Sequence, residues 1–425
     1  MILFVLAIAL LALLGMPLFT VLAVIALLFF RGAGIDTAAV IIEMNRLATA
    51  PMLIAIPLFT FAGYLFAEAG SPRRLVRFSR AVLGWVPGGL ALVALVACAV
   101  FTAFTGASGV TIIAMGGILM PALLAERYGE RFTLGLLTTT GSLGLLFPPS
   151  LPVILYAYVA QVSVDKLFLA GLLPGLLLIL MLGLYAARAA RDVPRHRFTT
   201  GEVLAAARGA AWELPLPLAV LGGIYSGIVT ITEAAALTAL YALVVEVFIY
   251  HDITIRALPR IMKESTVLVG GILIILAAAL GLTNYLIDAE VPYAIFDWMQ
   301  RFVQSKLLFL LMLNLFLLVV GCLMDIFSAL IVVVPLIVPI AQGYGVDLLH
   351  LGIIFLVNLE IGYSTPPVGL NLFIASFRFR RPVAELYRAS LPFLAILLAA
   401  LFIITYVPGL TLFLTGPAGA PGAAP

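Results

Sequence analysis

The chain of 425 residues has little charge, cysteine or histidine. Charged residues make up 10% of it, against about a quarter in soluble domains. With a net charge of only +3, this composition argues against a soluble protein and a nucleic-acid-binding surface. The two cysteines, Cys98 and Cys322, lie in apolar segments, so we expect buried thiols rather than a disulfide framework or metal cluster. No cofactor is expected.

Hydrophobic residues, at 64%, dominate the composition. Many apolar runs approach or exceed the roughly 20 residues that cross a bilayer, which predicts an all-α polytopic membrane protein. Simple spans are expected at 2–30, 51–69, 168–187, 214–231, 233–250, 267–287 and 389–415. Amphipathic pieces at 35–47, 72–84 and 252–264 are expected along the membrane surface. Residues 2–30 have no preceding basic residue and are predicted to be a retained helix rather than a signal peptide.

One block of sequence occurs twice. The pair Pro148-Pro149 returns 218 residues later as Pro366-Pro367. The same offset relates Gly63 to Gly281, Pro121 to Pro339, and Leu173-Pro174 to Leu391-Pro392. We therefore predict two copies of one unit, 1–205 and 206–415, followed by a disordered tail of Gly, Ala and Pro at 416–425.

Each copy has one hairpin pattern and one interrupted helix. The paired runs 88–104 with 109–124, and 306–323 with 326–342, are separated by small or polar residues, which predicts helical hairpins that enter the membrane and return. The Pro-Pro regions 132–160 and 350–376 predict discontinuous helices, because proline removes a backbone donor and breaks a helix. Carbonyl groups freed in such a break need other partners inside a membrane.

Charge indicates the relative orientation of the copies. The segment after Gly70 holds four arginines and no acid, at positions 73, 74, 77 and 80. Its counterpart holds Asp288, Glu290 and Asp297 and no base. Basic loops favour the cytoplasm, so the copies are predicted to be inverted. Inverted repeats with broken helices are typical of secondary transporters, whose sites lie at mid-membrane.

Hydroxyl and carbonyl oxygens at the hairpin tips and helix breaks suit a hard cation such as Na⁺. In the first copy they come from the hairpin tip Thr105–Ser108 and the break Gly144–Ser150. In the second they come from the tip Gly321–Phe327 and the break Gly362–Val368, where Thr365 adds a hydroxyl. Two cation sites, one per copy, are the resulting hypothesis.

Two polar residues allow two interpretations each. Asn371 follows the second break and could donate to a substrate carboxylate or form a helix-packing hydrogen bond. Asp325, at the second tip, could line the path of the substrate or a coupling ion, or could cap a helix. The helices that resume after Pro149 and Pro367 begin with positive dipole ends, which favour an anionic group.

Several motifs resemble the large membrane subunit of TRAP transporters, the tripartite ATP-independent periplasmic carriers of organic acids. They are Asn-Leu-Glu-Ile-Gly-Tyr-Ser-Thr-Pro-Pro-Val-Gly-Leu-Asn-Leu-Phe (358–373), Gly-Gly-Ile-Leu-Met-Pro-Ala-Leu (116–123), Ile-Pro-Leu-Phe-Thr-Phe-Ala-Gly (56–63) and Ile-Thr-Glu-Ala-Ala-Ala (231–236). The resemblance runs from about residue 2 to 415. It implies an elevator-type transporter of the inner membrane that takes up an organic acid, such as a C4-dicarboxylate, with Na⁺ as coupling ion. It also implies two partners, a separate four-helix membrane subunit and an extracytoplasmic binding protein.

The resemblance also implies ligand sets for two sodium ions. The first set is Thr105, Ser108, Gly144, Phe147 and Ser150. The second set, mostly main-chain oxygens, is Gly321, Gly362, Thr365 and Val368. The first tip reads Thr-Gly-Ala-Ser where the family typically has Ser-Gly-Ser-Ser, so one hydroxyl of that tip is lost.

The sequence also bears on functions other than transport. No segment gathers a nucleophile with a base, and there is no Gly-x-x-x-x-Gly-Lys-Ser/Thr loop, so the chain is not predicted to be an enzyme or to use ATP itself. A passive anion channel and a structural subunit of a larger complex stay open as alternatives. Glu360, before the second break, is expected to accept hydrogen bonds from unwound backbone N–H groups. His196, His251 and His350 are expected in solvated loops.

Overall fold

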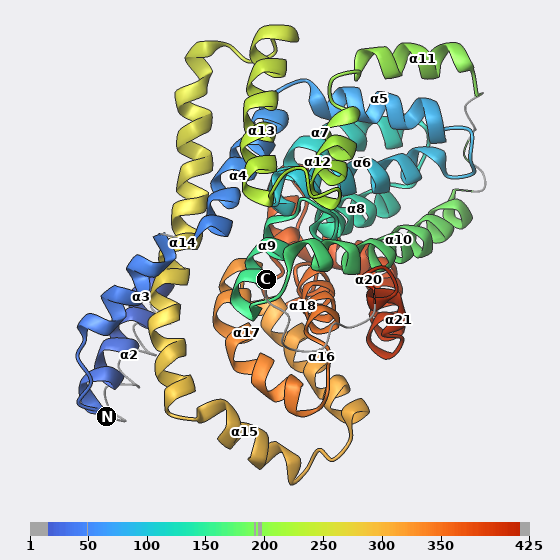
Figure 1. The fold of residues 1–425 in the computed structure, drawn as a ribbon. Helices are drawn as coiled ribbons and strands as arrows, with labels where there is room; N and C mark the ends of the chain where they lie inside the picture. Colours follow the sequence, from blue (N-terminus) through green and yellow to red (C-terminus); the bar gives the residue numbers. More distant parts are fainter. Residues whose placement is uncertain (1–15, 49, 191–192, 194–197, 417–425) are drawn as a thin grey trace.

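The computed structural model describes residues 16–48, 50–190, 193 and 198–416, and within these residues it contains helices and no strand (Figure 1). The elements before the mid-chain linker are α2 (Leu18–Gly32), α3 (Ala38–Ala48), α4 (Pro51–Glu68), α5 (Ser71–Leu83), α6 (Gly89–Thr105), α7 (Ser108–Ala125), α8 (Glu130–Thr139), the 3₁₀ helix η1 (Thr140–Leu146), α9 (Leu151–Ala160) and α10 (Val164–Ala189). The start of the expected first span, His196 and nearly all of the expected tail lie outside the described residues.

The described part of the second half of the chain is also helical. Its elements are α11 (Thr200–Gly209), α12 (Pro215–Tyr225), α13 (Ile231–Val244), the π-helical turn η2 (Val245–Ile249), the 3₁₀ turn η3 (Ile255–Ala257), α14 (Leu258–Asp288), α15 (Val291–Gln300), α16 (Lys306–Leu323), α17 (Ile326–Gly343), α18 (Leu348–Gly362), α19 (Leu370–Phe379), α20 (Val383–Tyr406) and α21 (Gly409–Leu412). Both hairpins lie within two residues of their predicted bounds.

Eight of the described helices are long and apolar enough to cross a membrane, or nine if the pair Glu130–Leu146 and Leu151–Ala160, bent by 46°, counts as one span. The chain is therefore a multi-pass membrane protein. The prediction of a full span at 214–231 was wrong. There α12 has 11 residues, or about 16 Å at 1.5 Å per residue, which is short of the roughly 30 Å hydrocarbon core.

The longest helix, α14, corrects a second prediction. Residues 252–264 were expected to form a separate surface helix, but α14 runs unbroken for 31 residues from Leu258. In the first copy α3 ends at Ala48 and α4 begins at Pro51, because a residue before proline is pushed out of the helical region. Val269, which lies 218 residues after Pro51, allows the helix to continue.

The helices separate into two groups in Figure 1. The long helix α14 packs against α2, α3 and α4, and α13 packs against α4, along one side of the molecule. The hairpins α6–α7 and α16–α17 and the interrupted helices lie on the other side. The short helices α5 and α15, which precede the two hairpins, lie at opposite ends of the molecule.

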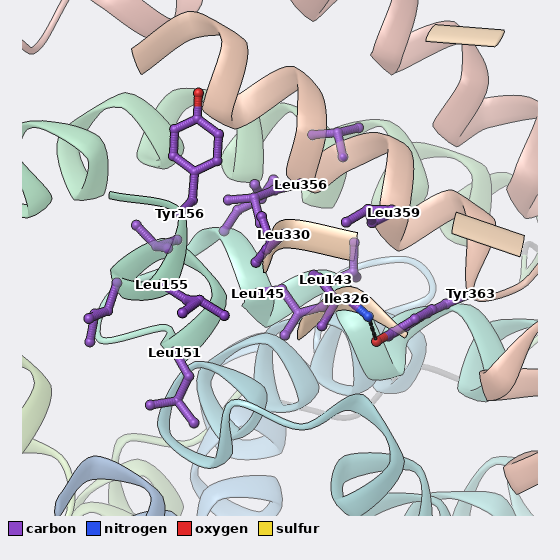
Figure 2. Close-up of a cluster of buried hydrophobic side chains, with 14 of the residues drawn as sticks. Leu143, Leu145, Leu151, Leu155, Tyr156, Ile326, Leu330, Leu356, Leu359 and Tyr363 are labelled. Atoms are coloured by element: carbon purple, nitrogen blue, oxygen red, sulfur yellow. Dashed lines mark hydrogen bonds between the residues drawn. The ribbon is translucent and has the colours of Figure 1, made fainter. Parts of the chain in front are cut away.

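The core between the two halves of the chain is apolar and closely packed (Figure 2). It brings together side chains of η1 and α9 with side chains of α17 and α18, each at most 1% exposed: Leu143, Leu145, Leu151, Leu155, Tyr156, Ile326, Leu330, Leu356 and Leu359. Tyr156 also donates to the carbonyl oxygen of Leu348, at 2.8 Å. The interrupted helices are therefore held by contacts between the halves.

Candidate ion and substrate site

The first hairpin turns where the sequence predicted. Helix α6 ends at Thr105, Gly106 adopts a left-handed φ of 63°, and α7 begins at Ser108. A Cβ at Gly106 would lie 2.4 Å from Cδ1 of Leu151, the first residue of α9. The tip therefore rests on the start of the helix that resumes after the first break.

The first break is a change of helix type followed by a short link. Helix α8 passes into η1 at Thr140, η1 ends at Leu146, and α9 begins at Leu151 after a link that contains a cis Pro148-Pro149 bond. A Cβ at Gly144 would lie 2.1 Å from the carbonyl oxygen of Ala99 in α6. This glycine permits the break to lie directly against the first hairpin.

Oxygen atoms near the first tip and break are available as ligands. The hydroxyls of Thr105 and Ser150 are buried and have no hydrogen-bond partner among the described residues. The carbonyls of Gly144 and Phe147 each accept one backbone N–H, both at 3.1 Å, which leaves a second lone pair on each oxygen. The Phe147 ring lies against Gly175 of α10, so only its main-chain oxygen is placed to serve the predicted site.

The second hairpin and break are in direct contact. A Cβ at Gly362 would lie 2.4 Å from the carbonyl carbon of Gly321, near the end of α16. The backbone N–H of Ile326 donates to the hydroxyl of Tyr363 at 2.5 Å (Figure 2). The structure thus brings together the tip and the break of the second copy, as the sequence predicted.

The second break is more open than the first. Val368 is 41% exposed, and Pro366 and Pro367 are also exposed, whereas the first Pro-Pro pair is buried. The Thr365 hydroxyl donates to the carbonyl of Ile361 at 2.8 Å, and its oxygen keeps lone pairs for another partner.

Asp325 is the N-cap of α17. Its Oδ1 accepts from the backbone N–H groups of Phe327 and Ser328, at 3.0 and 3.1 Å, and the Ser328 hydroxyl donates to its Oδ2. The capping interpretation is therefore observed. A role for this carboxylate toward substrate or ion stays a prediction.

Asn371 joins the two breaks. It is fully buried, and its Nδ2 lies 3.5 Å from the hydroxyl of Ser142 in η1. Its backbone N–H donates to the carbonyl of Tyr363 at 2.9 Å, while its Oδ1 has no partner in the described part of the chain. Ser142 and Tyr363 were not predicted, although both lie within the interrupted motifs.

Two polar residues differ from expectation. Neither carboxylate oxygen of Glu360 has a hydrogen-bond partner in the described ranges, so the predicted bonds to backbone N–H groups are absent there. Helix α18 keeps its own bonds through Gly362, which leaves no free N–H beside Glu360. His350 is buried, with Nδ1 2.9 Å from the Thr411 hydroxyl and Nε2 3.1 Å from the Thr405 carbonyl. The prediction that it is solvated was wrong, whereas His251 is exposed as expected.

The chain matches the family model described as "Tripartite ATP-independent periplasmic transporter, DctM component" over residues 4–410. It belongs to this family. It is a TRAP transporter large permease, and therefore a transport subunit rather than an enzyme.

The names of relatives within the family specify different substrates. The C4-dicarboxylate TRAP transporter large permease protein DctM of Pseudomonas aeruginosa is 40% identical over 365 residues, which cover 85% of this chain and 86% of that protein. The ectoine/5-hydroxyectoine large permease of Ruegeria pomeroyi is 33% identical, covering 95% and 96%. The isethionate TRAP transporter permease protein DctMQ of Oleidesulfovibrio alaskensis is 36% identical, covering 86% and 58%.

A solved structure has the same fold. The YdaH transporter of Alcanivorax borkumensis, whose topology is described as unusual, superposes with a TM-score of 0.65 at 12% identity, covering 89% of this chain and 88% of that one. At this identity the likeness extends to the fold alone.

Proposed function

We propose that this TRAP large permease performs Na⁺-coupled uptake of an organic acid across the bacterial inner membrane. Its partners would be a separate small membrane subunit and an extracytoplasmic binding protein that delivers the substrate. The single observation that carries the proposal is the pair of interrupted helices, each in contact with the tip of a helical hairpin. Irregular backbone at membrane depth is tolerated where it lines a binding site.

The element bounds support a duplicated unit. Helix α7 begins at Ser108 and α17 at Ile326, and α8 begins at Glu130 and α18 at Leu348. In both pairs the offset is the 218 residues found in the sequence. Together with the opposite charge of α5 and of the segment around α15, this favours two inverted repeats that meet at Asn371 and Ser142.

Two sodium sites follow from the oxygen atoms at each tip and break. For the first site we propose the oxygens of Thr105, Ser108, Gly144, Phe147 and Ser150. For the second we propose those of Gly321, Gly362, Thr365 and Val368. Unpartnered buried hydroxyls at the first site are costly to leave without a ligand, and a cation would satisfy them.

The substrate group would lie between the start of α9 and the start of α19. Both helix N-termini direct positive dipole ends and N–H groups toward an anion, and Asn371 adds an amide beside the second. The substrates named for the relatives carry a carboxylate or a sulfonate group. An organic acid such as a C4-dicarboxylate therefore fits the proposed pocket, with Asp325 near its path.

The transport step we propose is an elevator movement. The hairpins and interrupted helices would slide as one body against a scaffold that includes α2, α4, α13, α14 and the small subunit. The connecting arms would be α5 and α15, since each lies between a scaffold helix and a hairpin in the chain. The amphipathic pieces at 35–47 and 252–264 are not assigned as arms, because the second of these continues into α14.

Uptake of radiolabelled C4-dicarboxylate into proteoliposomes containing the complete three-part system tests the coupling. We expect uptake only when an inward Na⁺ gradient and the binding protein are both present. Collapsing the Na⁺ gradient with an ionophore while keeping the membrane potential should abolish accumulation. Uptake that persists without sodium and without the binding protein would instead support the passive anion channel.

A further inference from the structure

Helix α5 carries ion pairs at both ends, and the two ends reach different parts of the molecule. Near its N-terminal end, Arg74 pairs with Glu246 and Asp252, which follow the scaffold helix α13, and with Glu213, which directly precedes α12. Near its C-terminal end, Arg80 Nη2 lies 2.9 Å from Glu126 Oε1, directly after the hairpin helix α7. One short amphipathic helix therefore links the scaffold to the first hairpin.

Arg74 is the centre of a partly buried cluster. Its guanidinium lies 2.6 Å from Glu213 Oε1, 2.9 Å from Glu246 Oε2 and 2.6 Å from Asp252 Oδ2. The guanidinium carbon also lies 3.8 Å from the centroid of the Tyr250 ring. The planar guanidinium of arginine can donate to several carboxylates at once and stack on an aromatic ring. Lysine cannot reproduce this combination.

Two residues at the start of α5, one through its backbone and one through its side chain, bind the same carboxylates. Gly70 N–H donates to Asp252 Oδ2 at 2.8 Å. The Ser71 hydroxyl contacts Glu213 and lies 3.1 Å from Glu246 Oε1. A Cβ at Gly70 would lie 2.7 Å from Asp252 Oδ2 and 2.8 Å from Arg74 Nη1, so a larger residue here would displace this ion pair. Gly70, Ser71 and Arg74 thus attach the start of α5 to the segments that precede α12 and follow α13.

The rest of α5 is held differently. A cavity of about 250 Å³ separates Leu75 and Phe78 of α5, together with Phe101 of α6, from Leu216 and Pro217 of α12. Most of its lining is apolar, although Ser71 and Glu213 of the charged cluster also line it, and apolar atoms that face a gap lack packing partners there. Movement of α5 and the hairpin past α12 would therefore break few contacts here, whereas movement at Arg74 would break several charged ones.

The other proposed arm lacks this attachment. Within the described residues α15 has no ion pair, and its Phe296 packs instead against Gly343 and Tyr344 at the end of α17. The second arm is thus tied to its hairpin by aromatic contact. The charged attachment to the scaffold belongs to the first arm.

We infer that Arg74 is a pivot: it keeps the start of α5 on the scaffold while Arg80 and the first hairpin move. Arg74 is a positioning residue for the transport step, and this inference rests on the elevator movement proposed above. Removing its charge would leave three carboxylates together without their cation. The start of α5 would then detach, and hairpin movement would no longer be guided.

Spin-label distances in the complete transporter test the pivot directly. Labels would be attached at Arg73→Cys with Phe248→Cys, and at Leu124→Cys with Phe248→Cys, all exposed positions. With and without Na⁺ and substrate, we expect the 73–248 distance to stay unchanged and the 124–248 distance to shift. A shift in both distances would overturn the pivot alone. No shift in either would overturn the elevator and the pivot with it.

Transport rates supply the second readout. We expect Arg74→Gln to lower the maximal uptake rate about tenfold, as for the loss of charge-assisted bonds, with the Na⁺ concentration for half-maximal uptake unchanged. The control Arg77→Gln removes the same charge from an exposed position on the same helix that has no ion pair among the described residues, and should transport normally. If Arg74→Gln fails to fold, the variant R74Q/E213Q/E246Q also removes two of the three opposing charges and should fold but stay slow. A wild-type rate in either Arg74 variant would overturn the inference.

Discussion

At the scale of single residues, the proposed sodium sites depend on side-chain hydroxyls from Ser108 and Thr365. We expect Ser108→Ala and Thr365→Ala each to remove one oxygen ligand. A loss of about 1 kcal/mol per ligand raises the Na⁺ concentration for half-maximal uptake roughly fivefold. The measurement is a sodium titration of initial uptake rates in proteoliposomes at saturating binding protein and substrate.

Thr138→Ala is the matched control. Thr138 is fully buried and lies outside both proposed ligand sets, and its hydroxyl donates to the carbonyl of Leu134 at 2.7 Å, as the Thr365 hydroxyl does to Ile361. Removal of the Thr138 hydroxyl should leave the Na⁺ concentration for half-maximal uptake the same as in the unaltered protein. An unchanged titration in both Ser108→Ala and Thr365→Ala would contradict the assigned ligands.

The sequence located the hairpin tips and breaks that make up the proposed site and missed residues whose contacts are with distant parts of the chain. Thr105, Gly144 and Gly362 could be found because each lies at a visible interruption of an apolar run. Tyr363 and Ser142 act on Ile326 and Asn371, which are 37 and 229 residues away along the chain. The burial of His350 likewise depends on Thr405 and Thr411. Such pairings are set by tertiary packing, which local patterns do not encode.

At the scale of elements, the hairpins and breaks were predictable because small and polar residues punctuate them. The length of α14 and the shortness of α12 were not. Both lie in apolar sequence, where hydropathy marks membrane burial but not where a helix ends. The start of α4 at Pro51 shows the contrast, since proline gives a local signal that Val269 lacks.

The close approach of Gly321 and Gly362 gives a prediction for the second hairpin. In Gly362→Ala the new Cβ would meet the backbone of Gly321 at 2.4 Å, and backbone cannot rotate away as a side chain can. We expect uptake to fall more than about tenfold, as for strain of roughly 1.5 kcal/mol or more. The measurements are initial uptake rate and the apparent melting temperature in detergent.

Gly270→Ala is the control for this substitution. A Cβ at Gly270, inside α14, meets nothing within 4 Å, and alanine favours a helix over glycine. Uptake should be preserved and the melting temperature equal or higher. If Gly362→Ala transports as well as Gly270→Ala, transport does not depend on the close contact between Gly321 and Gly362.

At the scale of the whole molecule, the low charge of the chain makes its few loop charges informative. The arginines of α5 and the acids around α15 lie at opposite ends of the structure (Figure 1). Since basic loops are retained in the cytoplasm, α5 should face the cytoplasm and α15 the outside. Composition alone predicted a membrane protein. The packing of its helices could not be predicted in this way, because it depends on contacts between the two copies.

This orientation can be tested with a membrane-impermeant maleimide on oriented vesicles. We expect Arg73→Cys to react only from the cytoplasmic face and Asp297→Cys only from the external face, because both positions are exposed on helices at opposite ends. The unsubstituted chain is the control, since Cys98 and Cys322 are buried and should react slowly. Labelling of both new cysteines from one face would mean that the copies are parallel. An inverted pair of arms would then be impossible, and the elevator movement would lose the symmetry on which its two alternating states depend.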